Sequence, residues 1–138
     1  MRRFAWAVLA LGLLVVAPAV AHAQQDAAVQ LRRNYPNPFN PETTIPFVLS
    51  PGLWDDGVAP VVTMRIYDIL ARLVAVPILQ QSGEDLENVS LTWNGTGQYS
   101  AYWDGKVRDT NREAASGVYI YQLIVDGKVY TMKMTIVK

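Results

Sequence analysis

The sequence contains no cysteine, and its single histidine, His22, lies near the N-terminus. A chain without cysteine forms no disulfide bond and offers no thiolate as a nucleophile or metal ligand. If the N-terminal segment is removed as a leader, the remaining chain lacks histidine as well. It then cannot build a Ser-His-Asp or Cys-His catalytic arrangement, nor a zinc site of His and Cys ligands. We therefore expect no cofactor and no metal, and we expect that the protein is not an enzyme.

The sequence also lacks an excess of either charge, because 12 Lys and Arg residues balance 12 Asp and Glu residues. Removal of Arg2 and Arg3 with a leader leaves 10 basic and 12 acidic residues, a net charge of −2. A nucleic-acid partner would require a basic patch to meet its phosphates, so we expect none. After the leader, no apolar run is long enough to span a bilayer.

The first residues have the three-part layout of a secretory signal peptide. Arg2 and Arg3 precede an apolar run, and Ala21-His22-Ala23 supplies small residues at a cleavage site. An N-terminal membrane anchor is the alternative, but the apolar run is short for one. We expect a signal peptide over residues 1–23, a short linker over 24–30 and one domain over 31–138.

From residue 43 onward, the sequence alternates with the two-residue period of β-strands. We expect strands over 43–49, 61–69, 72–79, 89–93 and 98–103, and a hairpin of 118–125 with 128–138. The dipeptide Asp126-Gly127 is a strong signal for the two-residue turn of that hairpin. Pro46 lacks a backbone donor, so the first of these strands should lie at an edge or pair on one side only. The pattern favours an all-β protein, a seven-stranded antiparallel sandwich, with a small barrel as the alternative.

A proline-rich segment precedes these strands. We call residues 34–41 the lead-in; its sequence is Asn34, Tyr35, Pro36, Asn37, Pro38, Phe39, Asn40 and Pro41. Proline fixes φ and favours extended geometry in the residue before it, so the lead-in should be stiff. We expect both aromatic side chains to dock on the sandwich while the three asparagines make turn hydrogen bonds.

Four segments of the sequence resemble segments of a known family, and they occur in the same order as in that family. These are LRRNYPNPFNPETTIPFVL (31–49), MRIYDILARLV (64–74), GQYSAYWDGK (97–106) and SGVYIYQLIVDGKVYTMKMTIVK (116–138). They resemble the type A C-terminal sorting domains of the type IX secretion system. That family is immunoglobulin-like and is related to the immunoglobulin-like domain of the flagellar hook-capping protein. The resemblance runs from Leu31 to Lys138.

The resemblance implies a function in secretion or cell-surface sorting. The chain would cross the inner membrane on its signal peptide, fold in the periplasm, and reach the outer-membrane surface or the extracellular space. Its partners would be the type IX translocon and sortase-like processing machinery, with attachment to a surface glycolipid as a further possibility. The lead-in and the closing strands, with Lys133 and Lys138, would form the recognition surface. The sequence leaves the oligomeric state open.

Two other readings stay open at this stage. The chain could be a free-standing immunoglobulin-like adhesion or carbohydrate-binding module, or the remnant of a larger gene. Two positions also depart from the family pattern, because Ala71 and Asn111 stand where glycine is usual. We expect a changed or strained turn at Ala71 and a milder effect at Asn111, since asparagine tolerates left-handed backbone.

Several polar and aromatic groups suggest chemistry but have simpler explanations. Asp55 and Asp56 lack the full spacing of a calcium loop and are expected to be a solvated turn. Three acidic residues near the middle of the chain, Glu84, Asp85 and Glu87, have no opposing carboxylate pair and are expected to protect a strand edge. Trp54 and Trp93 are the candidates for a sugar-stacking surface, but we expect packing.

Overall fold

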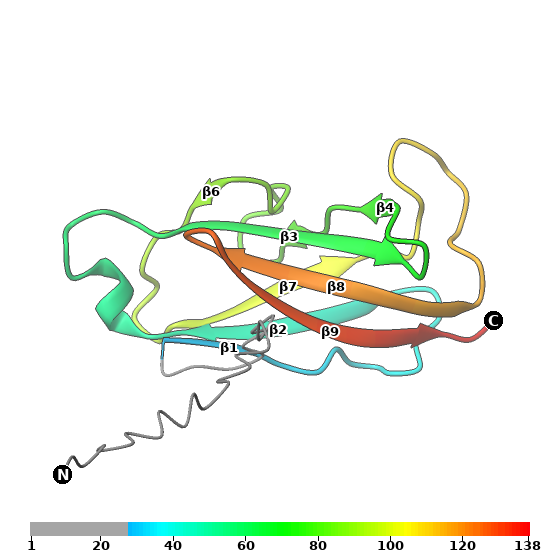
Figure 1. Cartoon of the computed structure of the whole chain (residues 1–138), viewed down its shortest axis with the longest axis horizontal. Coiled ribbons are helices and arrows are strands. Elements are labelled where there is room, and N and C mark those ends of the chain that lie inside the picture. The colour runs from blue at the N-terminus through cyan, green and yellow to red at the C-terminus, as the bar shows by residue number, and fades with distance from the viewer. Residues whose placement is uncertain (1–27) are drawn as a thin grey trace, which may run out of the picture.

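The computed structural model describes residues 28–138, and these fold into two antiparallel sheets that pack face to face (Figure 1). The expected signal peptide over 1–23 and most of the expected linker lie outside the described residues. Within residues 28–138, no helix is long and apolar enough to cross a membrane. The all-β expectation is confirmed, and the only helical element of this part of the chain is a single 3-10 turn, η1 (Pro51–Trp54).

The first sheet has the order β1-β2-β7-β5, and the second has the order β4-β3-β8-β9, with β6 paired to β3 off that path. The strands of the first sheet are β1 (Val29–Leu31), β2 (Thr43–Leu49), β5 (Ile78–Leu79) and β7 (Gln98–Trp103). Those of the second are β3 (Val61–Asp68), β4 (Leu73–Ala75), β6 (Val89–Ser90), β8 (Gly117–Val125) and β9 (Lys128–Ile136).

The core lies between the sheets and is built from every second residue of the long strands. In β2, the buried positions include Ile45, Phe47 and Leu49, and the residues between them are only partly buried. In β8, Tyr121 and Leu123 point inward in the same way. This alternation follows from the pleat, which sends neighbouring side chains to opposite faces.

Two expected elements differ from the structure. The expected strand over 72–79 is divided, because β4 belongs to the second sheet and β5 to the first. Pro77 lies between them and has no amide hydrogen for a continuous ladder, so the chain changes sheets there. Val29–Leu31, most of which fell in the expected linker, is strand β1 paired with β2. Residues 28–138 therefore contain nine strands instead of the expected seven.

The position of Pro46 also corrects an expectation. Strand β2 is not an edge strand, because β1 and β7 flank it. The Arg32 amide donates to the Pro46 carbonyl at 3.0 Å, but Pro46 has no N–H to return to the Arg32 carbonyl. That carbonyl instead accepts from the Tyr121 hydroxyl at 2.7 Å. A side chain of the opposite sheet thus replaces the donor that proline removes.

The hairpin of β8 and β9 forms as expected. Val125 pairs with Lys128 across the two-residue turn, and Asp126 and Gly127 have φ values of 47° and 84°. The turn also caps the start of β3, because the Asp126 amide donates to the Val61 carbonyl at 3.0 Å and the Val61 amide donates to the Asp126 carboxylate at 2.8 Å.

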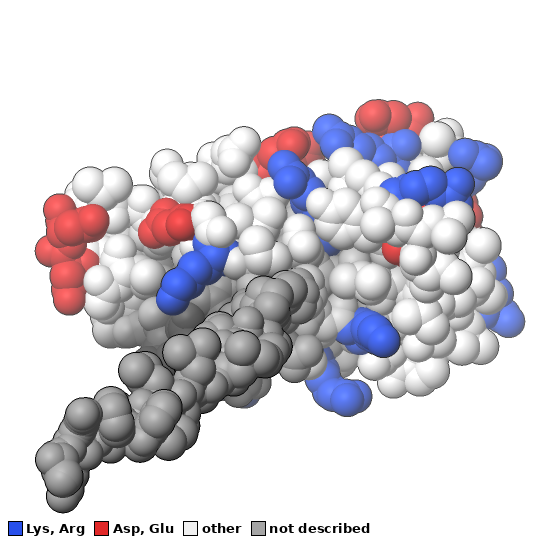
Figure 2. Space-filling model, in the orientation of Figure 1, with Lys and Arg blue, Asp and Glu red and all other residues white. Residues whose placement is uncertain are grey.

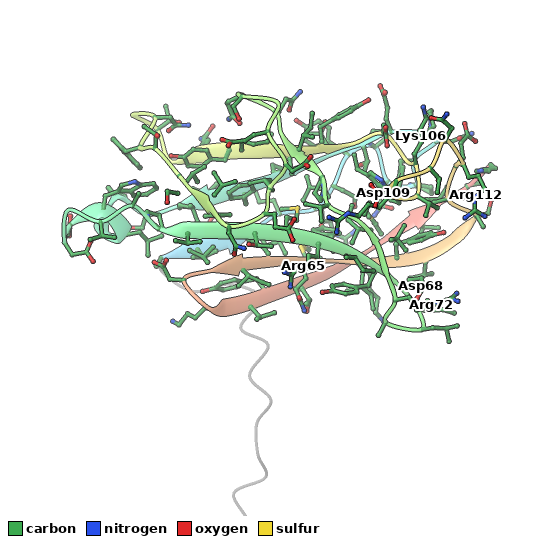
Figure 3. The ribbon with its side chains drawn as sticks, turned by 90° about the horizontal axis from the view of Figure 1, so that it is seen from above. Arg65, Asp68, Arg72, Lys106, Asp109 and Arg112 are labelled. Carbon is green, nitrogen blue, oxygen red and sulfur yellow. The ribbon has the colours of Figure 1, made fainter. Side chains whose placement is uncertain are left out.

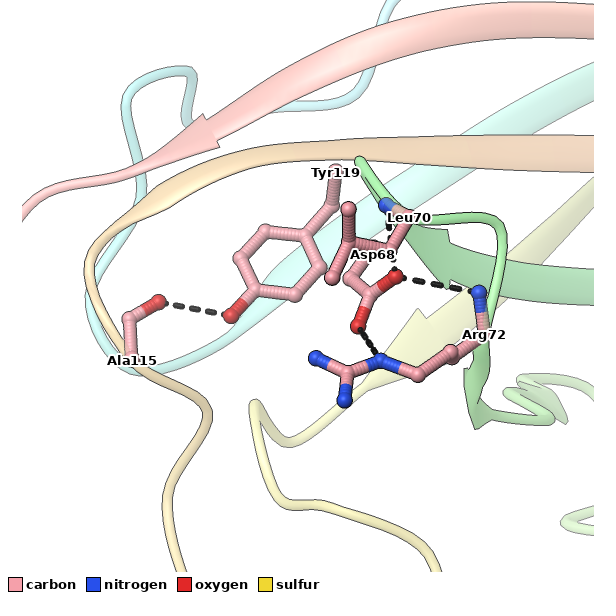
Figure 4. Close-up of polar contacts among 5 residues, drawn as sticks. All are labelled: Asp68, Leu70, Arg72, Ala115 and Tyr119. Atoms are coloured by element: carbon pink, nitrogen blue, oxygen red, sulfur yellow. Dashed lines mark hydrogen bonds and ion pairs between the residues drawn. The ribbon is translucent and has the colours of Figure 1, made fainter.

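The turn after β3 has the left-handed residue expected at Ala71, with φ 61°. The Asp68 carboxylate holds this turn by accepting from the amides of Leu70 and Arg72 and from the Arg72 guanidinium (Figure 4). These bonds, led by the Arg72 amide, lower the pKa of Asp68. The expectation for Asn111 is wrong, because Asp109 is the residue of that loop with positive φ, at 60°.

We expect the substitution Ala71→Gly to stabilise the protein. A left-handed backbone costs a residue with a Cβ about 1–2 kcal/mol, and the greater freedom of glycine in the unfolded chain offsets part of the gain. The net gain should be about 0.5–1 kcal/mol. It should raise the midpoint of urea denaturation. Ala115→Gly is the control, since Ala115 is exposed and has no positive φ, and it should lower the midpoint. A lower midpoint for Ala71→Gly would contradict this account of the turn.

Candidate functional site: the lead-in end of the sandwich

The lead-in connects the two sheets at the end of the molecule where the C-terminus lies (Figure 1). Tyr35 and Thr44 exchange two backbone hydrogen bonds, of 2.8 and 2.9 Å, which attach the lead-in to β2. Phe39 then forms a parallel bridge with Ile136 of β9. Its amide donates to the Thr135 carbonyl at 3.0 Å, and its carbonyl accepts from the Val137 amide at 3.2 Å. The lead-in thus binds the first sheet to the last strand of the second.

The three asparagines of the lead-in have different roles. Asn34 is buried, and its side-chain NH₂ donates to the Pro36 carbonyl at 3.3 Å and to the Thr43 hydroxyl at 3.1 Å. Asn37 accepts from the Thr135 amide of β9 at 3.2 Å rather than closing a turn. Asn40 is exposed and makes no side-chain hydrogen bond within residues 28–138. The expectation of three turn-forming asparagines therefore holds for Asn34 alone.

The two aromatic residues of the lead-in also differ. Phe39 is 2% exposed and meets the Trp103 ring edge-on at a centroid distance of 5.6 Å. Trp103 meets Tyr119 in the same manner at 5.8 Å, and its indole N–H donates to the Lys106 carbonyl at 3.0 Å. Tyr35 is 58% exposed, so the expectation that both aromatics dock is wrong for Tyr35. Its backbone holds the bridge while its ring faces solvent.

The turn after β7 fits against the lead-in through Gly105. Its φ is 82°, and a Cβ atom at this position would lie 1.9 Å from the Pro41 carbonyl oxygen. Because that contact involves backbone, no side-chain rotation could relieve it. Glycine is therefore required here both for conformation and for space. The Trp-Asp-Gly block and the lead-in, far apart in the sequence, form one packed unit.

Tyr121 is a buried polar residue of this end that our sequence analysis did not single out. Its hydroxyl donates to the Arg32 carbonyl at 2.7 Å and accepts from the backbone N–H of Asn34 at 3.2 Å. Burial raises the pKa of Tyr121 to about 12. The alternation of the strand could have indicated the buried position of Tyr121, since residues 119, 121 and 123 share the inward face. A buried tyrosine hydroxyl needs a hydrogen-bond partner.

Lys133 and Lys138 are both exposed, as expected. Lys133 lies on the outer face of the second sheet, opposite Ile120 of β8. Lys138 forms an ion pair with Glu113 at 3.1 Å, and its amide donates to the Ser116 hydroxyl at 3.1 Å. The two lysines are therefore not one cluster. Lys133 belongs to the sheet face, whereas Lys138 fastens the C-terminus to the 104–116 loop.

The charged groups near this end do not converge on a reaction centre. Figure 3 shows Asp68 at the end of β3 and Arg72 on the turn that follows, and Lys106, Asp109 and Arg112 on the loop after β7. Within residues 28–138, no group of three or more His, Cys, Asp or Glu side chains could hold a metal ion. The solvated turn at Asp55 and Asp56 and the edge protection by Glu84, Asp85 and Glu87 stay predictions.

The aromatic residues of the opposite end pack together. Trp54 meets Trp93 edge-on at 5.0 Å and stacks with Tyr99 at 6.5 Å. The Trp54 indole N–H donates to the Leu91 carbonyl at 2.9 Å. Trp54 is only partly exposed, and Trp93 is 37% exposed. The planes of Trp54 and Trp93 meet at 63°, and Tyr99 is buried, so the three rings do not form one flat exposed surface for a sugar.

No family model matches the chain, and no curated protein matches it. Among solved structures, the chain is similar to an alkylpurine DNA glycosylase, AlkC of Pseudomonas fluorescens, bound to DNA containing an abasic site analog. The sequence identity is 17% and the TM-score is 0.42, over 83% of this chain and 32% of that chain. The matched region is thus about a third of the glycosylase.

This comparison corrects one expectation of the sequence analysis. We expected that the protein is not an enzyme, whereas the matched structure is a glycosylase and therefore an enzyme. That expectation is withdrawn. A likeness with this TM-score carries no argument about the chemistry of the present chain, so no activity replaces it.

Phe39 and Tyr35 make a matched pair for a stability test of the lead-in. Phe39→Ala should lower the free energy of unfolding by about 3–4 kcal/mol, the cost of removing a buried aromatic ring. Tyr35→Ala should change it by less than about 0.5 kcal/mol, because the ring is exposed. Urea denaturation followed by tryptophan fluorescence measures both. Equal effects of the two substitutions would mean that the lead-in does not dock through Phe39.

Tyr121 should make stability depend on alkaline pH. The unfolded chain loses this proton near pH 10.0, whereas the folded protein keeps it until about pH 12. The folded state is therefore favoured below pH 10 and loses this advantage as pH rises towards 12. Tyr121→Phe should cost about 1–2 kcal/mol at pH 7, since the Arg32 carbonyl loses its donor, and should flatten the decline above pH 10. An exposed control, Tyr35→Phe, should leave the profile unchanged. A Tyr121→Phe profile as steep as that of the wild type would contradict the assignment.

Proposed function

We propose that residues 31–138 form an immunoglobulin-like sorting domain, recognised by the outer-membrane machinery of a type IX secretion system. The protein would be exported by its signal peptide, fold in the periplasm, and reach the outer-membrane surface or the medium. Sortase-like processing and attachment to a surface glycolipid belong to the same proposal. The resemblance of the four sequence blocks is its starting point, and the arrangement of those blocks in space is its main support.

The strand order supports the immunoglobulin-like part of the proposal. Across the first sheet, β1, β2, β7 and β5 correspond to strands A, B, E and D of that fold, and across the second, β3, β8 and β9 correspond to C, F and G. Tyr119, near the start of β8, donates from its hydroxyl to the Ala115 carbonyl at 2.7 Å (Figure 4). A tyrosine at the start of strand F that bonds to backbone a few residues upstream is a hallmark of immunoglobulin-like domains.

The observation that carries the sorting proposal is the meeting of three blocks at the lead-in end. The lead-in bonds to β9, and its Pro41 lies against Gly105 of the Trp-Asp-Gly block. Each of these segments resembles a signature block of the sorting domains. Residues that pack against one another restrict each other's substitution. The contact therefore gives a physical reason for the three blocks to occur in one sequence.

The arrangement also suggests how recognition could depend on folding. The outward groups of the lead-in, such as Tyr35, Asn37 and Asn40, are displayed only while Phe39 is bonded to β9. Because β9 follows the other described strands in the sequence, this surface exists only after the chain has been synthesised through β9 and folded. A translocon that binds it would therefore select folded domains.

An export assay tests the proposal. A periplasmic reporter with a signal peptide is fused ahead of residue 28, so that β1 is kept intact, in a host with a working type IX system. We expect the reporter at the cell surface or in the medium. Deletion of 128–138 should trap it in the periplasm, because β8 loses its partner and Phe39 its anchor.

A second comparison separates recognition from folding. The exposed-residue variant Tyr35→Ala/Lys133→Ala should fold normally and be exported poorly. Its control, Val58→Ala/Arg112→Ala, also changes one apolar and one basic exposed residue but lies outside the lead-in and β9, so it should be exported. If the intact fusion stays in the periplasm while an established sorting tail exports the same reporter, the proposal is wrong.

A further inference from the structure

Among residues 28–138, no strand pairs with the middle of β9 on the side away from β8. Lys128 and Val125 form the hydrogen-bonded pair next to the two-residue turn. In an antiparallel ladder such pairs alternate, so the backbone groups of every second residue of β9, counted from Lys128, bond to β8. Thr135 belongs to the other set, since its main chain bonds to Asn37 and Phe39 on the side away from β8. By the same alternation, the main-chain groups of Thr131 and Lys133 point away from β8. No hydrogen bond within residues 28–138 occupies them on that side.

A hollow lies beside this open edge. Its volume is about 350 Å³, and it is lined by Arg33, Ile120, Thr131, Met132 and Lys133. Within the described residues, neither Arg33 nor Lys133 forms an ion pair. The hollow therefore combines two unpaired cations, a threonine hydroxyl and an apolar wall next to unused backbone donors and acceptors.

The two chain segments that form this edge carry charge of one sign. The segments 28–41 and 128–138, which meet here through β1 and β9, contain five basic residues and no acidic ones. The five are Arg32, Arg33, Lys128, Lys133 and Lys138, of which Lys138 is paired with Glu113 of the 104–116 loop. This bias is local, since the whole chain has equal numbers of basic and acidic residues. Figure 2 shows the corresponding face, where the lower right of the described surface carries isolated basic groups on an otherwise uncharged background.

We propose that the β9 edge is a binding site for an extended acidic peptide, which adds to the second sheet as a further strand beside Thr131 and Lys133. Main-chain hydrogen bonds to the edge would supply much of the affinity, as in other cases of strand addition. Arg33 and Lys133 would select carboxylate side chains. The apolar wall at Ile120 and Met132 would accommodate the uncharged residues that alternate with them.

The chemistry disfavours a second copy of this chain at the same edge. Two β9 edges brought together would oppose basic segments that contain no acidic residue, and like charges across paired strands are destabilising. Lysine on an edge strand is a common protection against such pairing. The same charges attract a strand of opposite sign, so protection against self-association and selection of an acidic partner have one cause.

A binding assay with the purified protein tests the inference. The probe is a labelled ten-residue peptide of alternating Glu and Thr, followed by fluorescence anisotropy. We expect binding that weakens with added salt, because ionic contacts at an exposed edge are screened. A peptide with the same sequence and charge but methylated backbone nitrogens should not bind, since it cannot donate to the edge. Hydrogen exchange should show new protection at the Thr131 and Lys133 amides when the unmodified peptide binds.

Two variants of Thr131 separate the backbone from the side chain. Thr131→Pro removes an N–H that points away from β8, so the sheet should persist while binding weakens about tenfold or more, the loss expected for one strong hydrogen bond. Thr131→Val keeps the N–H and removes only the hydroxyl, so it should bind within about twofold of the wild type, since main-chain bonds carry strand addition. Lys133→Glu should weaken binding, whereas Arg112→Glu, on the 104–116 loop, should not.

Three outcomes would overturn the inference. One is equal binding of the methylated peptide, and another is binding of dextran sulfate without binding of the acidic peptide, which would make the surface a general anion site. The third is no binding of the acidic peptide at millimolar concentration. The inference goes beyond the proposed sorting function, and the assay needs no secretion system. A negative export assay and a negative binding assay therefore remain separate results.

Discussion

The bridge between Phe39 and the end of β9 is the contact on which the rest of the structure depends. Strand β9 lies at the edge of the second sheet and has a continuous partner, β8, on one side only. Phe39 supplies the other side at the C-terminal end, while its ring packs under Trp103 between the sheets. Since Tyr35 attaches the same segment to β2, eight residues hold the open side of the sandwich closed without a disulfide bond.

A second constraint follows from the proline inside β2. An internal strand normally excludes proline, because one ladder bond is lost and a carbonyl is left without a donor. Here the Tyr121 hydroxyl donates to the Arg32 carbonyl and also accepts from the backbone N–H of Asn34. The Tyr121 hydroxyl thus links both the Arg32 carbonyl and the lead-in to the opposite sheet. The buried hydroxyl explains both the tolerance of Pro46 and the raised pKa of Tyr121.

The strands with long alternating patterns were predictable, and those set by tertiary contacts were not. The hairpin of β8 and β9 was evident, because alternation and Asp126-Gly127 agree. Strand β1 has three residues and no turn signal, so only its partner β2 defines it. The lead-in has no periodicity that could separate the buried Phe39 from the exposed Tyr35. That difference arises from the parallel bridge to β9, which links residues about a hundred positions apart.

Strand β9 therefore serves stability and recognition with different parts of its length. Its C-terminal end is closed by the lead-in, so Ile136 is constrained by packing. In its middle, beside Arg33 and Lys133, no hydrogen bond within residues 28–138 uses the outward backbone groups, and the basic side chains protect the edge. A strand that needed protection alone could carry charge of either sign. The exclusive use of basic residues on both segments of this edge reduces the set of suitable partners to acidic ones, while the packed end keeps the edge in place for them.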